Sequence, residues 1–236
     1  MGTATGGIDN IRFMGTAIGD VLPLAIGVAV SPIPIIATIL MLLTPRAGST
    51  ATAFLAGWVL GIAVAYAIFV VVGSAIDLST DSDGNAVTAT IRLVLGLLML
   101  GLAAKQWRGR PAPGEEPTMP AWLSAMDKVT PVKAVALGFA LSAVNPKNLL
   151  MIVGAAVAVS QLALSAGSIV VVGIVFTVLA ASTVAVPVIG YFTMRERATS
   201  WLNGLKTWLT ANNAAVMSVL LLVIGVSLIG KGIGGY

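Results

Sequence analysis

Six long apolar stretches restrict this chain to one kind of fold. They lie at residues 17–43, 50–74, 88–107, 132–160, 167–192 and 213–230. A helix of about 20 residues crosses the hydrocarbon core of a bilayer, whereas the strands of a membrane barrel alternate between apolar and polar residues. Since 58% of the 236 residues are hydrophobic and only 9% are charged, the sequence predicts an all-α membrane protein with six transmembrane helices.

Proline clusters interrupt the first and fourth stretches near their middles. The clusters are Ser31-Pro32-Ile33-Pro34 and Asn145-Pro146-Lys147-Asn148. Proline has no amide proton and clashes with the preceding helical turn, so each cluster leaves backbone carbonyls unpaired where lipid offers no partner. Such a defect is tolerated beside a cavity or a binding site. We therefore expect broken first and fourth helices that line a central site.

The positions of the prolines also predict an internal repeat. A proline-rich segment at residues 108–130 separates two sets of three spans, 16–107 and 131–232, and each proline cluster lies about halfway along the first span of its set. An odd number of spans per set reverses the orientation of the second set, which predicts a 3+3 inverted repeat. Residues 1–15 are expected to form a flexible tail, and residues 233–236 a short one.

The basic residues predict how the protein sits in the membrane. With the N-terminus outside, nine of those near span ends lie inside and three lie outside. The nine are Arg46, Lys105, Arg108, Arg110, Lys128, Lys133, Arg195, Arg197 and Lys206; the three are Arg12, Arg92 and Lys231. The positive-inside rule then predicts a plasma (inner) membrane protein with both termini outside and segment 108–130 in the cytoplasm. Basic residues gathered at helix ends do not indicate nucleic-acid binding.

Lys147 is the strongest candidate for a functional residue. An ammonium group at mid-membrane costs roughly 2.5 to 3.5 kcal/mol on insertion scales. With Asn145 and Asn148 beside it and Ser31 in the other break, it offers donors for an anionic or hydroxyl-rich group. The alternative is that Lys147 only stabilises freed carbonyls. The predicted substrate-binding residues are Ser31, Pro32, Pro34, Ser142, Asn145, Pro146, Lys147 and Asn148.

Three further polar residues lie within the predicted spans. Asp20 is either a proton or cation carrier or an ordinary residue of the outer interface, and Thr38 and Tyr66 are candidates to line the cavity. The pair Gly57 and Gly61 is typical of helix packing and permits a homodimer without requiring one.

The sequence lacks the residues that several classes of enzyme activity require. The sequence has no cysteine and no histidine, which removes thiol chemistry, imidazole relays and the commonest metal ligands. It also has no nucleophile elbow, phosphate loop or metal-spaced ligand set. We therefore expect a protein that is not an enzyme and needs no metal or cofactor.

The two breaks resemble motifs of the lysine exporter superfamily. Its amino-acid exporters carry Pro-Gly-Pro in the first span and Asn-Pro-Lys-Ala in the fourth. This chain instead has Ser31-Pro32-Ile33-Pro34 before Ile35-Ile36-Ala37, and Asn145-Pro146-Lys147-Asn148 before Leu149-Leu150. With Phe54-Leu55-x-Gly57-Trp58, these variants resemble the GAP branch, whose members are associated with moving glycolipids or peptidoglycolipids to mycobacterial-type envelopes. The resemblance extends from about residue 16 to 232.

The resemblance implies a transporter that exports or flips a lipid-linked molecule through a central region at residues 31–34 and 145–148. Its partners would be the bilayer and that lipid-linked substrate. Two alternatives stay open. One is an exporter of amino acids or other small metabolites, and the other is a non-transporting scaffold for enzymes of envelope-lipid synthesis. A membrane enzyme would need an acid pair or metal set that the sequence lacks.

Overall fold

The computed structural model describes residues 3–75, 82–111, 121–194 and 196–235, which form helices and short turns without any strand. The α-helices are α1 (Thr3–Ala29), α2 (Pro32–Leu42), α3 (Ala47–Ala75), α4 (Ser82–Arg108), α5 (Pro131–Ala143), α6 (Pro146–Ser160), α7 (Ala166–Met194) and α8 (Glu196–Ile233), and η1 (Ala121–Lys128) is a 3-10 helix. The predicted all-helical class is confirmed for this part of the chain.

Five helices are each long and apolar enough to cross a membrane, namely α1, α3, α4, α7 and α8. Helices α5 and α6 together form a further span that bends by 61° at the break between them. Short α2 follows α1 along the chain after the first break and is an apolar helix of only 11 residues, too short to cross a membrane alone. The chain is thus a multi-pass membrane protein with five or six spans, compared with the six predicted.

Both predicted breaks are present. Helix α1 ends at Ala29 and α2 begins at Pro32, while α5 ends at Ala143 and α6 begins at Pro146. Each new helix has a proline in its first turn, where the missing amide proton would have no intrahelical partner anyway.

Two of the predicted boundaries differ from the structure, and a third predicted segment is described only in part. Helix α1 begins at Thr3, so the segment expected to be a flexible tail is helical over most of its length. Helix α8 runs from Glu196 to Ile233, far beyond the predicted span 213–230, because residues from Thr199 onward are already apolar enough to extend it. Of the predicted linker 108–130, residues 112–120 lie outside the described residues.

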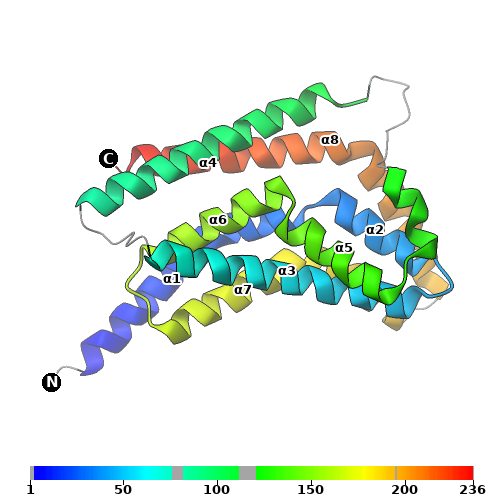
Figure 1. Cartoon of the computed structure of the whole chain (residues 1–236), viewed down its shortest axis with the longest axis horizontal. Helices are drawn as coiled ribbons and strands as arrows, with labels where there is room; N and C mark the ends of the chain where they lie inside the picture. Colours follow the sequence, from blue (N-terminus) through cyan, green and yellow to red (C-terminus); the bar gives the residue numbers. More distant parts are fainter. Residues whose placement is uncertain (1–2, 76–81, 112–120, 195, 236) are drawn as a thin grey trace.

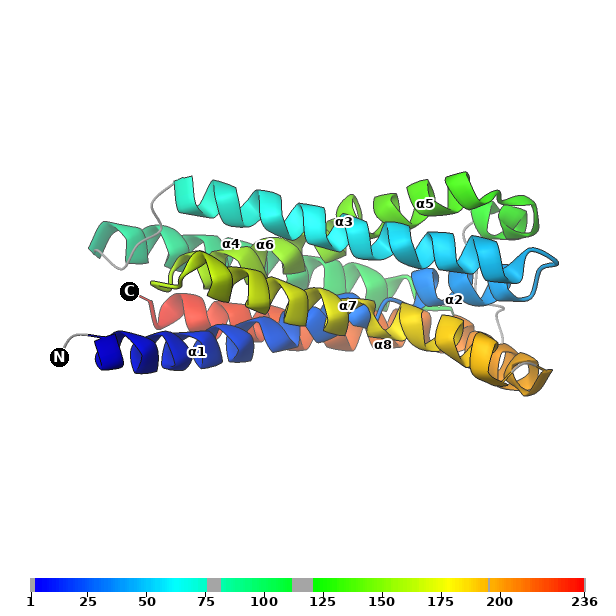
Figure 2. The same cartoon turned by 90° about the horizontal axis from the view of Figure 1, so that it is seen from below.

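The helices form a bundle with α4 and α8 along one side, and both ends of the chain lie at the same end of the bundle (Figures 1 and 2). The large side chains Phe54, Trp58 and Phe176 are fully buried in the core that α3 and α7 share with their neighbours. An even number of crossings brings both termini to one membrane surface, in agreement with this arrangement.

Glycines let helices α3 and α5 approach backbone to backbone. A Cβ atom at Gly57 would lie 2.0 Å from the carbonyl oxygen of Val135, and one at Gly138 would lie 2.2 Å from that of Phe54. At Gly61 it would lie 2.0 Å from the Ser142 hydroxyl oxygen. The predicted packing role of Gly57 and Gly61 is therefore confirmed, but α5 of the same chain covers this face, so it does not support a homodimer.

A similar contact joins α4 to α8. A Cβ atom at Gly96 of α4 would lie 2.8 Å from the carbonyl oxygen of Gly225 in α8. The reciprocal distance, from a Cβ atom at Gly225 to the carbonyl oxygen of Gly96, is 3.0 Å. The third helix of the first predicted repeat thus lies directly on the last helix of the second.

Candidate functional site at the two helix breaks

Lys147 joins the two breaks. It is the second residue of α6, and its Nζ donates to the carbonyl oxygens of Gly27 at 2.8 Å and Val30 at 3.3 Å, and to the Ser31 hydroxyl at 2.6 Å. All three acceptors belong to the first break or to the helical turn before it. The predicted arrangement, with a cation of one half opposite an unwound segment of the other, is present.

The prolines explain why two of the carbonyls near this break are free. In a regular helix the carbonyl of residue i accepts from the amide of residue i+4. The partner of Val28 would be Pro32 and the partner of Val30 would be Pro34, and proline has no amide proton to donate. The alternate spacing of the two prolines thus removes two bonds from one helix end.

Side chains replace the missing bonds. The Ser31 amide donates to Ala29 at 2.8 Å and leaves the Gly27 carbonyl to Lys147. The Ser31 hydroxyl donates to the Val28 carbonyl at 2.6 Å, and the Thr183 hydroxyl of α7 donates to the Ala29 carbonyl. Each of the last four carbonyls of this segment therefore has a partner, as buried polar groups require.

The electrostatics of the break favour a cation at this place. The carboxyl end of a helix carries a partial negative charge, and Lys147 brings its ammonium to the end of α1. An ammonium has three protons, and the three acceptors within reach use all of them. Lys147 therefore acts as a bridge between carbonyls here, and any substrate group has to displace one of these contacts.

The two asparagines have different roles. Asn145 caps its own helix, since its Oδ1 accepts from the Lys147 amide at 3.0 Å. Asn148 is fully buried, and its Nδ2 donates to the Leu141 carbonyl of α5 at 3.0 Å. Its Oδ1 lies 3.3 Å from the Ser31 hydroxyl oxygen. Asn148 thus links α5, α6 and the first break, whereas Asn145 serves the second break alone.

The remaining predicted binding residues are less closely connected to Lys147. Pro32 and Pro34 are buried at the start of α2, and Pro146 is exposed. Ser142 is fully buried, but its hydroxyl donates to Phe139 within α5 at 3.0 Å and packs against Gly61. The structure therefore places Ser142 at the seam between α3 and α5.

None of the three other candidates is among the acceptors of the Lys147 ammonium. Asp20 of α1 pairs with the Lys231 ammonium of α8 at 2.5 Å, and both side chains are partly exposed. Thr38 is fully buried and donates to the Pro34 carbonyl within α2 at 2.9 Å. Tyr66 is buried between α3 and α7. Asp20 thus holds two helices together, and Thr38 bonds its own helix.

Thr183 is the contact that the sequence did not single out. A hydroxyl in an apolar span usually bonds a neighbouring carbonyl, so the sequence does not distinguish Thr183 from Ser182 or Thr177. In the structure Thr183 and Val30 line a pocket of about 300 Å³ beside the first break, with Trp201 of α8 among its other walls. This pocket gives the break a neighbouring volume that opens between α7 and α8.

The described residues contain no group of three or more acidic, histidine or cysteine side chains that could hold a metal ion. The polar atoms at the breaks are carbonyls, hydroxyls, amides and one ammonium. They suit hydrogen bonding to a polar or anionic group.

The structure is a multi-pass helical bundle with two breaks, and a lysine at the second break contacts the unwound segment of the first. These features define the class of protein as a helical membrane protein with a polar centre. The family model described as Sap, sulfolipid-1-addressing protein, matches residues 21–234. The chain belongs to this family. Comparison with curated proteins and with solved structures gave no match.

The family match covers both breaks and nearly all the described helices. It agrees with the lipid-related membrane protein that the family resemblance implied. Membership of the wider lysine exporter superfamily has no corresponding match and stays a prediction.

Proposed function

We propose that this protein exports or flips a lipid-linked molecule with an anionic head group, and that the head group passes the contact between Lys147 and the first break. One observation carries the proposal: a lysine ammonium is held within the membrane by the carbonyls of Gly27 and Val30 and the hydroxyl of Ser31. The family description, which names a sulfolipid, supports a lipid as cargo. The role is non-enzymatic and needs no metal or cofactor.

The geometry suggests how a head group would enter. The contact from Lys147 to the Val30 carbonyl, at 3.3 Å, is the longest of the three. An anionic oxygen forms a stronger, charge-assisted bond with an ammonium than a carbonyl does. The head group would therefore displace Val30 first, while Gly27 and Ser31 keep the ammonium in place.

The helix pairings support alternating access by two inverted halves. Helix α3 packs on α5 and α6, and α7 packs on α1 and α2, so the second span of each set lies against the broken span of the other. Helices α4 and α8, the third spans, pack on each other. This exchange of partners is expected for a 3+3 inverted repeat. With both termini outside a plasma membrane, as the basic residues predict, export would run from the linker side to the terminal side.

A comparison of two variants tests the proposal. Lys147→Met removes the ammonium but keeps an unbranched side chain, and Thr183→Val removes another side-chain bond at the same break without changing charge. Purified variants would be placed in vesicles with phosphatidylglycerol that carries a nitrobenzoxadiazole dye, and flipping would be measured by dithionite quenching. Thermal unfolding of each variant would be measured in parallel.

We expect Lys147→Met to slow flipping by at least about tenfold relative to Thr183→Val, which corresponds to the loss of about 1.4 kcal/mol of interaction. The same probe with a zwitterionic phosphatidylcholine head group should show a smaller difference between the variants. If the loss of flipping in both variants were in proportion to the fall in their unfolding temperatures, Lys147 would only support the fold. This result would overturn the proposal.

A second candidate function has its own observation. All three protons of Lys147 are already bonded, as expected for a structural bridge in a membrane scaffold for lipid-synthesis enzymes. A scaffold predicts no flipping by the wild-type protein with either probe, together with a synthesis enzyme that copurifies in mild detergent. Vesicles loaded with labelled lysine test the remaining alternative, a small-metabolite exporter, in the same preparation.

A further inference from the structure

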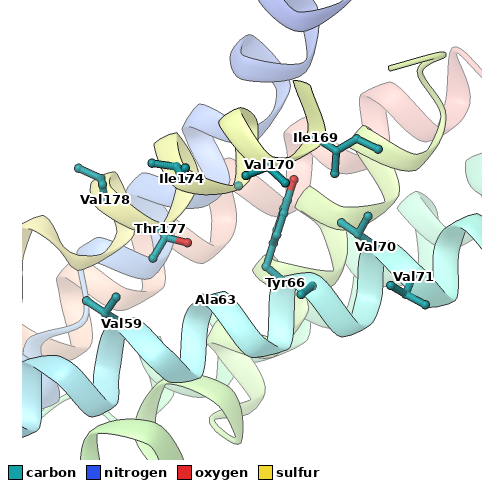
Figure 3. A pocket seen from close by; sticks show the side chains of 12 residues that line it. Val59, Ala63, Tyr66, Val70, Val71, Ile169, Val170, Ile174, Thr177 and Val178 are labelled. Carbon is teal, nitrogen blue, oxygen red and sulfur yellow. The ribbon is translucent and has the colours of Figure 1, made fainter. Parts of the chain in front are cut away.

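An apolar groove runs between α3 and α7, away from the two breaks. It has a volume of about 570 Å³, and its lining is aliphatic except for Tyr66 and Thr177 (Figure 3). Val71, Ile174 and Val178 on its walls are exposed. Both helices belong to the most apolar spans of the protein, so this groove opens toward the hydrocarbon chains of the bilayer.

Tyr66 is an exception within this groove. Its side chain is only 5% exposed, yet its hydroxyl has no hydrogen-bond partner among the described residues. The ring is fixed by stacking on Phe176, with 5.6 Å between ring centroids, and by contact with Gly173, where a Cβ atom would lie 2.7 Å from the ring. Figure 3 shows the ring crossing the groove from α3, with its hydroxyl near Val170 of α7.

An orphaned hydroxyl in a native fold calls for an explanation. A buried water typically makes about three hydrogen bonds, and only two of the side chains that line this groove are polar, those of Tyr66 and Thr177. A lipid chain fills the aliphatic part of the groove without loss of hydrogen bonds to water. An oxygen on that chain would in addition accept the Tyr66 proton.

We propose that the groove between α3 and α7 binds one acyl chain of a membrane lipid, and that Tyr66 donates a hydrogen bond to an ester or hydroxyl oxygen of that chain. That this lipid is the cargo rests on the proposed function. Thr177 precedes Thr183, which contacts the first break, by about 9 Å along α7. One lipid can therefore reach from the groove toward Lys147.

The site is tested with three photo-crosslinking probes in nanodiscs that contain the full chain. Each probe is a phosphatidylglycerol analogue with a diazirine on one chain: a diester, a diether, and a diether with a hydroxyl on the labelled chain. After illumination, labelled peptides are mapped by mass spectrometry. Tyr66→Phe removes only the hydroxyl, and Tyr191→Phe, in the last turn of α7, is the matched control.

We expect all three probes to label the α3 and α7 peptides of the wild-type protein. Tyr66→Phe should reduce labelling severalfold for the diester, for the hydroxylated diether or for both, but not for the plain diether. The probe that responds identifies the oxygen as ester or hydroxyl. Tyr191→Phe should change none of them. The proposal would be overturned if Tyr66→Phe changed the labelling by none of the probes. It would also be overturned if labelling of α3 and α7 were no stronger than labelling of α4 and α8.

A second variant tests the groove itself. Ala67→Phe fills it from an exposed position, and Ala136→Phe adds the same ring to an exposed position on α5. Only Ala67→Phe should lower labelling by all three probes. This readout does not depend on Lys147. If lipid probes still label the groove but Lys147→Met leaves flipping unchanged, the proposed function is refuted and the groove site is not.

Discussion

The two helix breaks contain similar residues but are stabilised differently. At the second break, Asn145 caps its own helix α6 through the Lys147 amide. At the first break, Ser31 precedes α2 without capping it, and its hydroxyl turns back to Val28 in α1. The rest of the first break depends on side chains from other helices, namely Lys147 of α6 and Thr183 of α7.

This difference shows where the structure concentrates its polar contacts. The second break satisfies the start of its helix locally, while its lysine serves the first break. Ser31 is 3% exposed, whereas Pro146 is exposed. The backbone of the first break is therefore the more buried of the two, and the second break supplies the charge that stabilises it.

The largest effect in stability should come from Ser31→Ala. This change leaves the Val28 carbonyl unpaired and removes one acceptor from Lys147, so the free energy of unfolding should fall by about 2 kcal/mol. Unfolding by SDS in mixed micelles measures it. Ser182→Ala is the control, since Ser182 bonds only Leu179 within its own helix, and should cost less than about 0.5 kcal/mol. Equal costs would show that the first break does not need its side chains.

A smaller loss is expected from Asn145→Ala. Removal of a helix cap costs about 1 kcal/mol, and the contacts of Lys147 with the first break should survive. Asn212→Ala, on an exposed turn of α8, controls for the loss of an amide. A loss of stability as large as that of Ser31→Ala would mean that the second break, like the first, is not stabilised by its own helix alone.

The smallest change should follow removal of the pair between Asp20 and Lys231. Both side chains are partly exposed, and such pairs contribute about 0 to 1 kcal/mol. Asp20→Asn and Lys231→Met should lower stability little, separately or together, and flipping should persist. If Asp20→Asn stopped flipping while the fold stayed stable, Asp20 would be an ion carrier, the role that the sequence also allowed.

The sequence predicted the features that follow directly from covalent chemistry. Proline lacks an amide proton, so Pro32, Pro34 and Pro146 located both breaks, and burial of a lysine predicted a partner for Lys147. The backbone acceptors could not be predicted, because every residue has a backbone carbonyl and nothing in the sequence distinguishes those of Gly27 and Val30. Their identity depends on how α6 packs against α1.

Side chains with many ordinary uses were also not distinguished. Thr183 and Ser142 are both hydroxyls in apolar spans, yet one bonds the first break and the other packs against Gly61. The start of α8 was missed because Trp201 and Trp208 are typical of a membrane interface, whereas the helix continues through them.

The close contact of Gly96 with Gly225 joins α4 to α8 along one side of the bundle. Small residues let two helix backbones approach closely, and such close packing drives helix association in a membrane. Residues 3–111 and 121–235 meet there through α4 and α8. If the protein transports a lipid as proposed, this tight seam would hold the two halves together on one side of the bundle while they separate elsewhere.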